Sequence, residues 1–232
     1  MILSIHQPRY WPWLGLLDKV SKSDIFVILD NVEYNSDSFQ SRCQIRNKEG
    51  WNWMTVPVYK KGRSGQLINE VEIVNNNKWE KKHWMMIKSN YSKANHFEDY
   101  SYEVKKIYNK NWKRLSNLNI CTMKTLFKLF NINTKILFAS NLEVSGDKSN
   151  LLANICYKLN ANIYLSGDGA KNYLNEKIFS NKNIKVKWQN FKHPNYEQRW
   201  KGFEEGMFGL DILFNHGNNS KELLLGCGFD ER

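Results

Sequence analysis

The sequence lacks closely spaced cysteines. Its four cysteines, Cys43, Cys121, Cys156 and Cys227, stand far apart, and none belongs to a CxxC pair of the kind that builds zinc sites or redox motifs. The five histidines form neither an HExxH nor an HxxxH pattern. We therefore predict reduced, mostly buried thiols, no metal and no cofactor. A catalytic thiol stays open, because a base could approach one of the cysteines in the fold.

Long hydrophobic runs are also missing. No stretch reaches the roughly 18 to 20 uninterrupted apolar residues that a membrane-spanning helix needs. Residues 1–6, MILSIH, have neither the basic start nor the apolar core of a signal peptide. We expect a soluble, cytoplasmic chain without membrane insertion. Internal repeats and low-complexity linkers are absent, and 232 residues with 41% hydrophobic content predict one domain over residues 1–232.

Acidic residues are outnumbered by basic ones. The chain has 23 Asp and Glu against 34 Lys and Arg, which gives a formal net charge of +11. Such a surface favours an anionic partner, which could be a nucleic acid, an anionic lipid or a phosphorylated small substrate. The alternative is that the lysines reflect coding bias in an AT-rich genome. The net charge alone does not distinguish among these partners and the coding bias. The sequence also does not give the oligomeric state.

Apolar runs that alternate with helical spacing indicate an α/β fold. Continuous runs at Ile2–Ile5 and Ile25–Leu29 are typical of strands buried on both faces, and the spacing from Trp13 to Val20 predicts a helix between them. Further strands are expected at 135–139, 162–165 and 184–191. Helices are expected at 148–160, from residue 171, and once more after residue 211. This order predicts a mainly parallel, Rossmann-like central sheet.

Two insertions interrupt the alternation. Residues 39–46 and 51–58 are rich in aromatic and β-branched side chains and flank the turn sequence NKEG at 47–50, which predicts a β-hairpin. A short strand is expected at 71–74, after a mobile surface loop around residues 62–65. Residues 78–130 have helix-compatible spacing with breaks near Asn95 and Asn117. They predict a mostly helical segment of three helices.

The most informative segment is HQPRYWPWLG at residues 6–15, which follows the first expected strand. Two prolines stiffen this loop while it presents His, Gln, Arg, Tyr and Trp side chains. In open α/β sheets, ligands bind outside the carboxyl ends of the strands. His6 is therefore a candidate general base or substrate ligand. The alternative is a buried structural histidine beside core aromatics.

Two further side chains are expected at the same edge. Asp30 closes the second strand, and His193 follows the strand that ends near residue 191, with Pro194 and Tyr196 just beyond. If these strands run parallel in one sheet, we expect His6, Asp30 and His193 to converge into a catalytic site. An N-cap or turn role is the alternative for Asp30.

Basic side chains predict anion-binding positions. Arg42 and Arg46 lie four residues apart on one face of a hairpin strand, where they could form a fork for phosphate. Together with Trp51 and Trp53 they would make a platform for a nucleotide sugar, bordered by the basic loop at 60–63. A solvated basic face is the alternative.

Two other segments give secondary candidates for substrate binding. Lys82 and His83 open the helical region, about 100° apart on a helix. The sequence SGDGA at 166–170 lies between an expected strand and an expected helix. Its glycines allow close backbone approach, and a helix N-terminus offers N–H groups to an anion. A tight strand-to-helix turn is the alternative there.

Six segments in order resemble the WbqC-like family, from Met1 to about Asn215: HQPRYWPWLGLLDKV, SDIFVILDNVEY, GWNWMTVPV, KKHW with a later Tyr91, YLSGDGAKNYL and FKHPNYEQ. The resemblance implies a bacterial protein connected with O-antigen and other surface polysaccharides. The residues it carries over are His6, Gln7, Pro8, Tyr10, Pro12, Trp13, Lys19, Asp30, Lys82, His83, Ser166, Gly167, Gly169, His193 and Pro194. A weaker resemblance to nucleotidylyltransferases of the HxGH type lacks both histidines of that motif and favours only a Rossmann-like fold.

The leading hypothesis is an enzyme that acylates or aminoacylates the amino group of a nucleotide-linked amino sugar. Basic residues would hold the diphosphate, aromatic rings would stack on base or sugar, and His6 or His193 would take the proton from the amine. An aminoacyl-tRNA is one candidate donor, since it would use the basic surface. The alternatives are a non-enzymatic protein that binds a nucleotide sugar, glycan or RNA, and a nucleotidylyltransferase-like enzyme.

Overall fold

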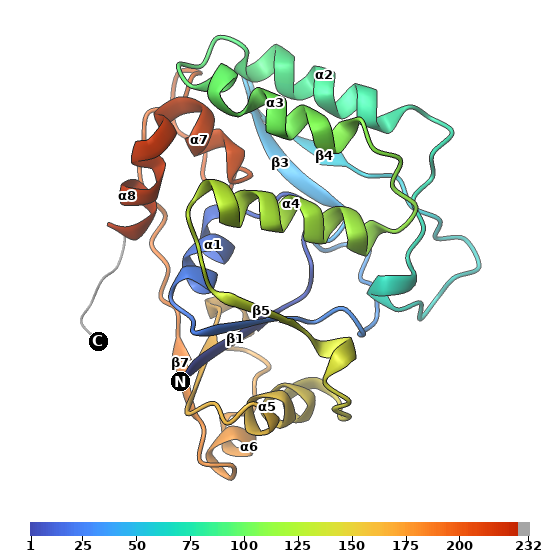
Figure 1. The fold of residues 1–232 in the computed structure, drawn as a ribbon, viewed down its shortest axis with the longest axis vertical. Coiled ribbons are helices and arrows are strands. Elements are labelled where there is room, and N and C mark those ends of the chain that lie inside the picture. The colour runs from blue at the N-terminus through green and yellow to red at the C-terminus, as the bar shows by residue number, and fades with distance from the viewer. Residues whose placement is uncertain (227–232) are drawn as a thin grey trace.

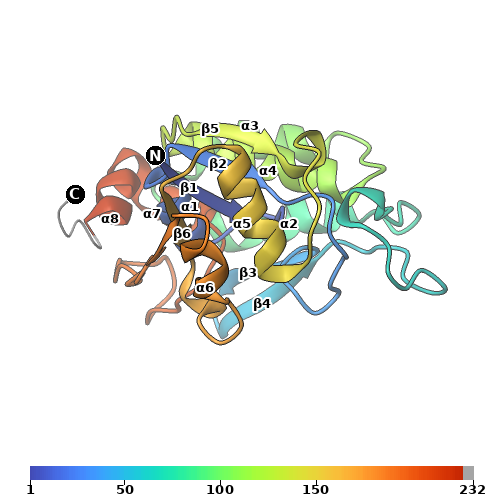
Figure 2. The same ribbon diagram turned by 90° about the horizontal axis from the view of Figure 1, so that it is seen from below.

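A five-stranded parallel sheet forms the centre of the molecule, and the computed structural model describes residues 1–226 around it. The strand order is β5-β2-β1-β6-β7 (Figures 1 and 2). The bounds are β1 Ile2–His6, β2 Ile25–Ile28, β5 Lys135–Phe138, β6 Ile163–Ser166 and β7 Lys185–Trp188. All four neighbouring pairs are parallel, which confirms the predicted α/β fold with its parallel sheet.

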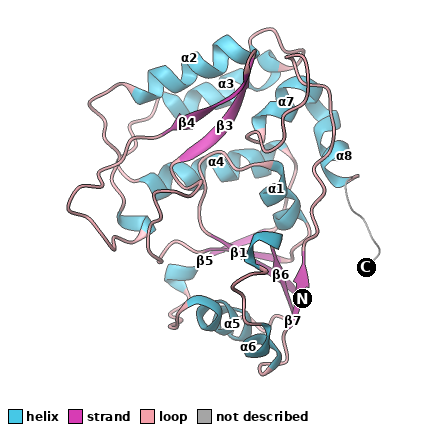
Figure 3. Ribbon diagram, turned by 180° about the vertical axis from the view of Figure 1, so that it is seen from behind, coloured by secondary structure: helices cyan, strands magenta, loops and turns pink. Residues whose placement is uncertain are grey.

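Eight α-helices and a hairpin surround the sheet within residues 1–226. The helices are α1 Leu14–Ser21, α2 Trp79–Tyr91, α3 Phe97–Tyr108, α4 Leu115–Leu129, α5 Lys148–Lys158, α6 Glu176–Ser180, α7 Leu210–His216 and α8 Ser220–Leu225. Short 3-10 helices are η1 Ile68–Glu70, η2 Ala139–Asn141, η3 Asp168–Ala170 and η4 Gly217–Asn219. Strands β3 Arg42–Asn47 and β4 Gly50–Thr55 form the predicted hairpin, which lies beside α2 and apart from the central sheet (Figure 3).

The inner strands are buried on both faces because helices cover both. Alternate side chains of β2 enter two separate hydrophobic clusters: Val27 belongs to one, together with Leu3 of β1, and Phe26 and Ile28 belong to the other. The first cluster packs against α5 and α6, and the second against α1 and α4 (Figures 1 and 2). Each fully buried aliphatic or Phe side chain contributes about 1.5–3 kcal/mol, so the two clusters explain why continuous apolar runs form these strands.

The connections reverse direction between β1 and β6. After β1, the chain passes through α1 to β2 and continues outward to β5, while α5 brings it back to β6 and then to β7 on the other side. Leu3 accordingly pairs with Ile25 of β2 and with Tyr164 of β6. The carboxyl ends of β1 and β6 therefore flank a topological switch point, which is where open α/β sheets hold ligands.

Four local predictions need correction. Residues 71–74 form only isolated bridges, Val58 with Ile73 and Glu72 with Arg114, because their backbone pairs with several different segments. The helix expected from residue 171 begins only at Glu176, since the preceding residues form turns after η3. The strand expected at 184–191 is shorter, and the tail after residue 211 contains two helices rather than one.

No helix within residues 1–226 combines the length and the apolar character that crossing a membrane requires. Residues 227–232, and Cys227 with them, lie outside the described part of the chain.

Candidate functional site

A cavity of about 660 Å³ opens at the carboxyl edge of the sheet, at the switch point between β1 and β6. Its volume falls within the roughly 300–1,000 Å³ of small-molecule sites. The ends of β1 and β6, helix α1, the segment after β7 and the hairpin all contribute to its wall. The side chains that line it include His6, Arg9, Lys19, Phe39, Gln189 and Phe191.

Trp13 forms one side of this cavity, directly before α1. Its ring covers Gly15, where a Cβ atom would come within 2.4 Å of the indole, so only glycine leaves room for the ring. Phe191 meets the same indole edge-on at 5.3 Å between centroids. The loop that leads to Trp13 is fixed by Asn119, whose side-chain amide donates to the carbonyl of Pro8 at 3.1 Å. The wall is thus built by packing and does not depend on a bound ligand.

Three basic side chains, His6, Arg9 and Lys19, line the cavity and are called here the basic cluster. Lys19 is only 4% exposed, and its Nζ donates to the carbonyl of Ile5 at 3.2 Å. Burial, followed by the nearby charge of Arg9, lowers the pKa of Lys19 to about 7. Burial likewise lowers the pKa of Arg9 to about 10. The cluster therefore holds positive charge that is costly to keep in a buried place.

His6 is the neutral member of the basic cluster. Burial, with the charges of Lys19 and Arg9, holds the pKa of its imidazole well below 6.5. Its Nδ1 lies 2.8 Å from the carbonyl oxygen of Gln7. Because a carbonyl only accepts, Nδ1 carries the proton, and Nε2 remains as an acceptor nitrogen.

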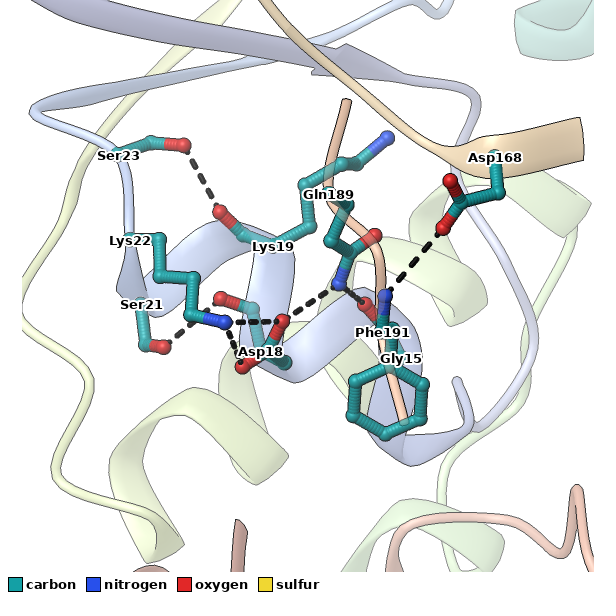
Figure 4. Close-up of polar contacts among 9 residues, drawn as sticks. All are labelled: Gly15, Asp18, Lys19, Ser21, Lys22, Ser23, Asp168, Gln189 and Phe191. Atoms are coloured by element: carbon teal, nitrogen blue, oxygen red, sulfur yellow. Dashed lines mark hydrogen bonds and ion pairs between the residues drawn. The ribbon is translucent and has the colours of Figure 1, made fainter. Parts of the chain in front are cut away.

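The carboxylate nearest in sequence to Lys19 has other partners. Asp18 forms an ion pair with Lys22 at 2.9 Å and accepts a hydrogen bond from Gln189 Nε2 at 2.7 Å. Figure 4 shows the Lys19 amine turned away from Asp18. Asp18 therefore does not neutralise the cavity.

Asp168, in the opposite wall, is also occupied. It forms an ion pair with Lys171 at 2.6 Å. It also accepts from the backbone N–H of Phe191 at 3.3 Å, as Figure 4 shows. Within residues 1–226, no carboxylate lies within ion-pair distance of the basic cluster. The cavity thus offers unpaired positive charge to an anionic ligand.

The segment 166–170 lines the cavity as predicted, but no long helix follows it directly. Ser166 ends β6, and η3 spans only three residues. A Cβ atom at Gly169 would meet nothing within 4 Å, and one at Gly167 would only touch Gln189 at 3.9 Å. These glycines therefore leave space beside the cavity, and the expected anion site on a long helix N-terminus is not formed.

Comparison with known proteins places the chain in a family. A family model described as the WbqC-like protein family matches residues 7–223. The chain belongs to the WbqC-like family. It is also 33% identical over 227 residues to a protein of Mycobacterium tuberculosis named "Uncharacterized protein Rv1507c", covering 97% of this chain and 98% of that one. No solved structure matches the chain.

Tyr10 and His83 of this WbqC-like protein lie together in the interior. His83 Nε2 donates to the Thr55 carbonyl at 3.1 Å, so its Nδ1 accepts from the Tyr10 hydroxyl at 2.9 Å. Tyr10 in turn contacts the hydroxyl of Tyr108 at 2.7 Å, which accepts from Trp11 Nε1 at 2.8 Å. This chain of hydrogen bonds fastens the loop after β1 to the helical insertion. Neither Tyr10 nor His83 lines the cavity.

Arg46 and Tyr196 belong to a second buried network, around Asp211. The Arg46 guanidinium donates to Gln198 Oε1 at 3.1 Å and to three backbone carbonyls. Tyr196 and Tyr91 donate their hydroxyl protons to Asp211, at 2.8 and 2.6 Å. Arg46 and Tyr196 are therefore placed away from the cavity wall, where they tie the hairpin to the C-terminal helices.

Asp30 and His193 do not join His6. Asp30 accepts from the backbone N–H and the hydroxyl of Ser140, at 3.0 and 2.7 Å, and so holds η2 beside the end of β2. The His193 ring stacks between Trp13 and Tyr196, with centroids 6.4 and 6.1 Å away. It therefore lies behind the cavity wall and supports Trp13. The expected convergence of three catalytic side chains is not formed.

The remaining predicted residues also have definite places. Gln7 accepts from Gln40 Nε2 at 2.8 Å, which ties the loop after β1 to the start of the hairpin. Arg42 lies over the ring of Trp53, 4.5 Å from its centroid, outside the cavity. Lys82 is exposed on α2. The basic loop at 60–63 does not border the cavity, and its Arg63 pairs with Glu72 at 2.6 Å.

Within residues 1–226, neither a cysteine nor a group of metal-binding side chains is placed at this cavity. Cys43, Cys121 and Cys156 are free, and burial raises the pKa of each thiol. None of the three lines the cavity. Within residues 1–226, no group of three or more His, Cys, Asp or Glu side chains is placed to hold a metal ion.

Sequence reasoning missed part of the wall. Arg9, Phe39, Gln189 and Phe191 were not among the predicted site residues, yet all line the cavity. Gln189 and Phe191 lie just past the carboxyl end of β7, so the strand-end argument would have found them had that strand been ended at Trp188. Arg9 lies within the loop already singled out. Phe39 gives no local signal, because the hairpin brings it to the cavity from outside the sheet.

Proposed function

We propose that this WbqC-like protein binds a nucleotide-linked amino sugar in the cavity and transfers an acyl group to the sugar's amino group, as an enzyme of bacterial surface polysaccharide assembly. The observation that carries the proposal is the basic cluster at the switch point, in which Lys19 is buried and His6 and Arg9 are half-buried, without a carboxylate partner within residues 1–226. A diphosphate is the ligand chemistry that would neutralise such a site.

The phosphates would be held by two kinds of cation. The Arg9 guanidinium offers a planar fork of N–H donors that matches phosphate oxygens, while the Lys19 ammonium is a compact charge. A bound diphosphate would raise the pKa of Lys19 from its value of about 7, because an adjacent anion favours the charged amine. Ligand binding and protonation of Lys19 are therefore coupled.

The proton of the attacking amine would pass to His6. In acyl transfer the amine nitrogen forms a bond to the acyl carbon, the donor's leaving group departs, and the amine gives up a proton. His6 is neutral at pH 7 because its pKa is held well below 6.5, and its Nε2 is the nitrogen free to accept. The donor group would take a proton as it leaves, which returns His6 to its starting state.

The acyl donor is proposed from charge alone. An aminoacyl-tRNA would use the net charge of +11, because a polyphosphate partner gains from many basic side chains. Membership of the WbqC-like family supports a role in surface polysaccharide assembly, because the resemblance to that family implies a connection with surface polysaccharides.

A second candidate is a protein that binds the same nucleotide sugar without catalysis. It is favoured by the surroundings of His6, whose ring bonds to the Gln7 carbonyl at 2.8 Å and has no carboxylate beside it within residues 1–226. A general base is commonly oriented by such a carboxylate. The two candidates share the cavity and differ in whether His6 removes a proton.

Mass spectrometry of the products separates these candidates. Purified protein would be incubated with nucleotide-linked amino sugars and with acyl donors that include charged tRNA. The enzyme proposal expects a mass increase of one acyl group on the sugar, which is absent with the His6→Ala variant. If the intact protein binds the sugar nucleotide yet forms no product with any donor, the binding protein becomes the better account.

A further inference from the structure

Three aromatic side chains form a strip that leads out of the cavity, called here the aromatic strip: Phe39, Trp53 and Trp51. They are 36%, 36% and 38% exposed. Phe39 and Trp53 lie 5.4 Å apart between ring centroids, and Trp53 and Trp51 lie 5.2 Å apart. Large apolar rings gathered on a surface in this way mark a place where a ligand or partner binds.

The strip starts in the cavity wall itself. Phe39 lines the cavity, and so does Gln44, which pairs with Trp53 across the hairpin. Trp51 lies two residues before Trp53 on β4 and pairs with Arg46, which does not line the cavity. A ligand that fills the cavity would therefore reach Phe39 first, then Trp53, and Trp51 last.

The charge along the strip is uneven. Arg9 of the basic cluster lies 5.0 Å from the Phe39 centroid, and Arg42 lies 4.5 Å from that of Trp53. No cation lies over Trp51 in the described part of the chain, and the carboxylate of Glu204 approaches neighbouring Gly50. Arg46, which pairs with Trp51, is buried, and its guanidinium is bound to Gln198 and three backbone carbonyls. The accessible positive charge therefore accompanies the half of the strip nearest the cavity.

We propose that Phe39 and Trp53 form a nucleobase subsite, on which the base of a nucleoside diphosphate stacks while its phosphates lie on Arg9 and Lys19. This inference rests on the proposed function and names the part of the substrate that lies outside the cavity. Every nucleobase has a π-face, and stacking on an aromatic ring beside an arginine is a common way to hold one.

Two other occupants fit the observations less well. A neutral glycan chain could stack on tryptophan, but it would gain nothing from the guanidinium groups over Phe39 and Trp53. A strand of RNA would continue along the strip and would need accessible positive charge at Trp51, where Arg46 is buried and Glu204 is an acidic neighbour. A single base linked to a diphosphate uses the half of the strip that carries cations.

Calorimetric titration with UDP and with inorganic pyrophosphate tests the subsite. The two probes share the diphosphate and differ in the nucleoside. Stacking of one base contributes about 1–3 kcal/mol, so Trp53→Leu and Phe39→Leu should each weaken UDP binding by roughly 5- to 100-fold. Pyrophosphate binding should change less than about twofold in both variants. Trp51→Leu is the matched control, since it removes an equally exposed indole from the same strand, and it should leave both affinities unchanged.

The outcomes separate this inference from the proposed function. If the intact protein binds UDP and both Trp53→Leu and Phe39→Leu bind it equally well, the subsite is refuted while the diphosphate site stands. If the intact protein binds neither probe, the proposed function fails first. An equal loss of UDP affinity in Trp51→Leu would refute the assignment to Phe39 and Trp53. Binding of a neutral maltooligosaccharide that depends on Trp53 would identify a glycan surface instead.

Discussion

Replacing Lys19 with methionine should make the protein more stable at neutral pH while removing affinity for phosphorylated ligands. The side chain is 4% exposed, its amine bonds only to the Ile5 carbonyl, and no carboxylate pairs with it within residues 1–226. Methionine has a similar length and no charge, so it suits the buried position. A residue that lowers stability where it stands is one that the fold alone does not require.

The magnitude follows from the pKa of Lys19. A fall from the ordinary 10.5 to about 7 corresponds to about 4–5 kcal/mol of unfavourable free energy for the charged amine. Because the folded pKa is the lower one, the unfolded chain binds more protons between pH 7 and pH 10.5. The cost is therefore complete below pH 7 and disappears as the pH rises to 10.5. The gain from Lys19→Met should shrink by about 2–3 kcal/mol between pH 6 and pH 9.

Urea denaturation of the two proteins at pH 6, 7.5 and 9 measures this gain. Losing the bond to Ile5 costs about 1 kcal/mol, so the net stabilisation at pH 6 should be about 3 kcal/mol. Lys93→Met is the control, since Lys93 is exposed and the same chemical change there should alter stability by less than about 0.5 kcal/mol at every pH. A destabilised Lys19→Met at pH 6, or a difference that does not vary with pH, would refute the reasoning.

Three further predictions concern the surroundings of the cavity. Gly15→Ala should lower both the melting temperature and the UDP affinity, because its Cβ would lie 2.4 Å from the Trp13 ring; unchanged UDP affinity would show that the ring does not shape the cavity. His83→Leu should cost about 1–3 kcal/mol in urea denaturation, because the Tyr10 hydroxyl loses its acceptor and the Thr55 carbonyl loses its donor, and should spare UDP affinity measured in the folded protein. His6→Ala should cut acyl-transfer turnover by about 10²–10⁴-fold with substrate affinity within a few fold; full turnover would remove His6 from the chemistry.

The sheet could be predicted because its inner strands have a strong sequence signal. Residues 25–29 are a continuous apolar run and residues 2–5 are apolar except for Ser4, and such runs form where helices cover both faces of a parallel strand. The hairpin was signalled by the turn residues between its strands. The segment at 71–74 is also apolar except for Glu72, but it pairs with residues far away in the chain, and no local pattern records which partners are available.

The candidate site was predicted only in part, for a geometric reason. His6 was correctly expected at the carboxyl edge of the sheet, and Ser166, predicted from its glycine-rich turn, lines the same cavity because β1 and β6 flank the switch point. It could not tell which strand ends face the cavity. Asp30 ends β2, on the far side of β1, where it holds η2 instead. Lys19 was carried over from the family resemblance, and its burial beside Arg9 is visible only in three dimensions.

The central claim is that the basic cluster binds the diphosphate of a nucleotide sugar, and calorimetry with UDP-N-acetylglucosamine tests it most directly. The diphosphate of this probe does not titrate near neutral pH, and its uracil stays protonated below pH 8, so any pH dependence of binding between pH 7 and pH 8 reports the protein. We predict binding at pH 7 that weakens toward pH 8 as Lys19 loses its proton. We also predict a loss of about 10- to 100-fold at pH 7 in Arg9→Gln and in Lys19→Met, and the remaining affinity of Lys19→Met should no longer vary with pH. Equal affinity in all three proteins, or binding that strengthens as the pH rises, would contradict the account.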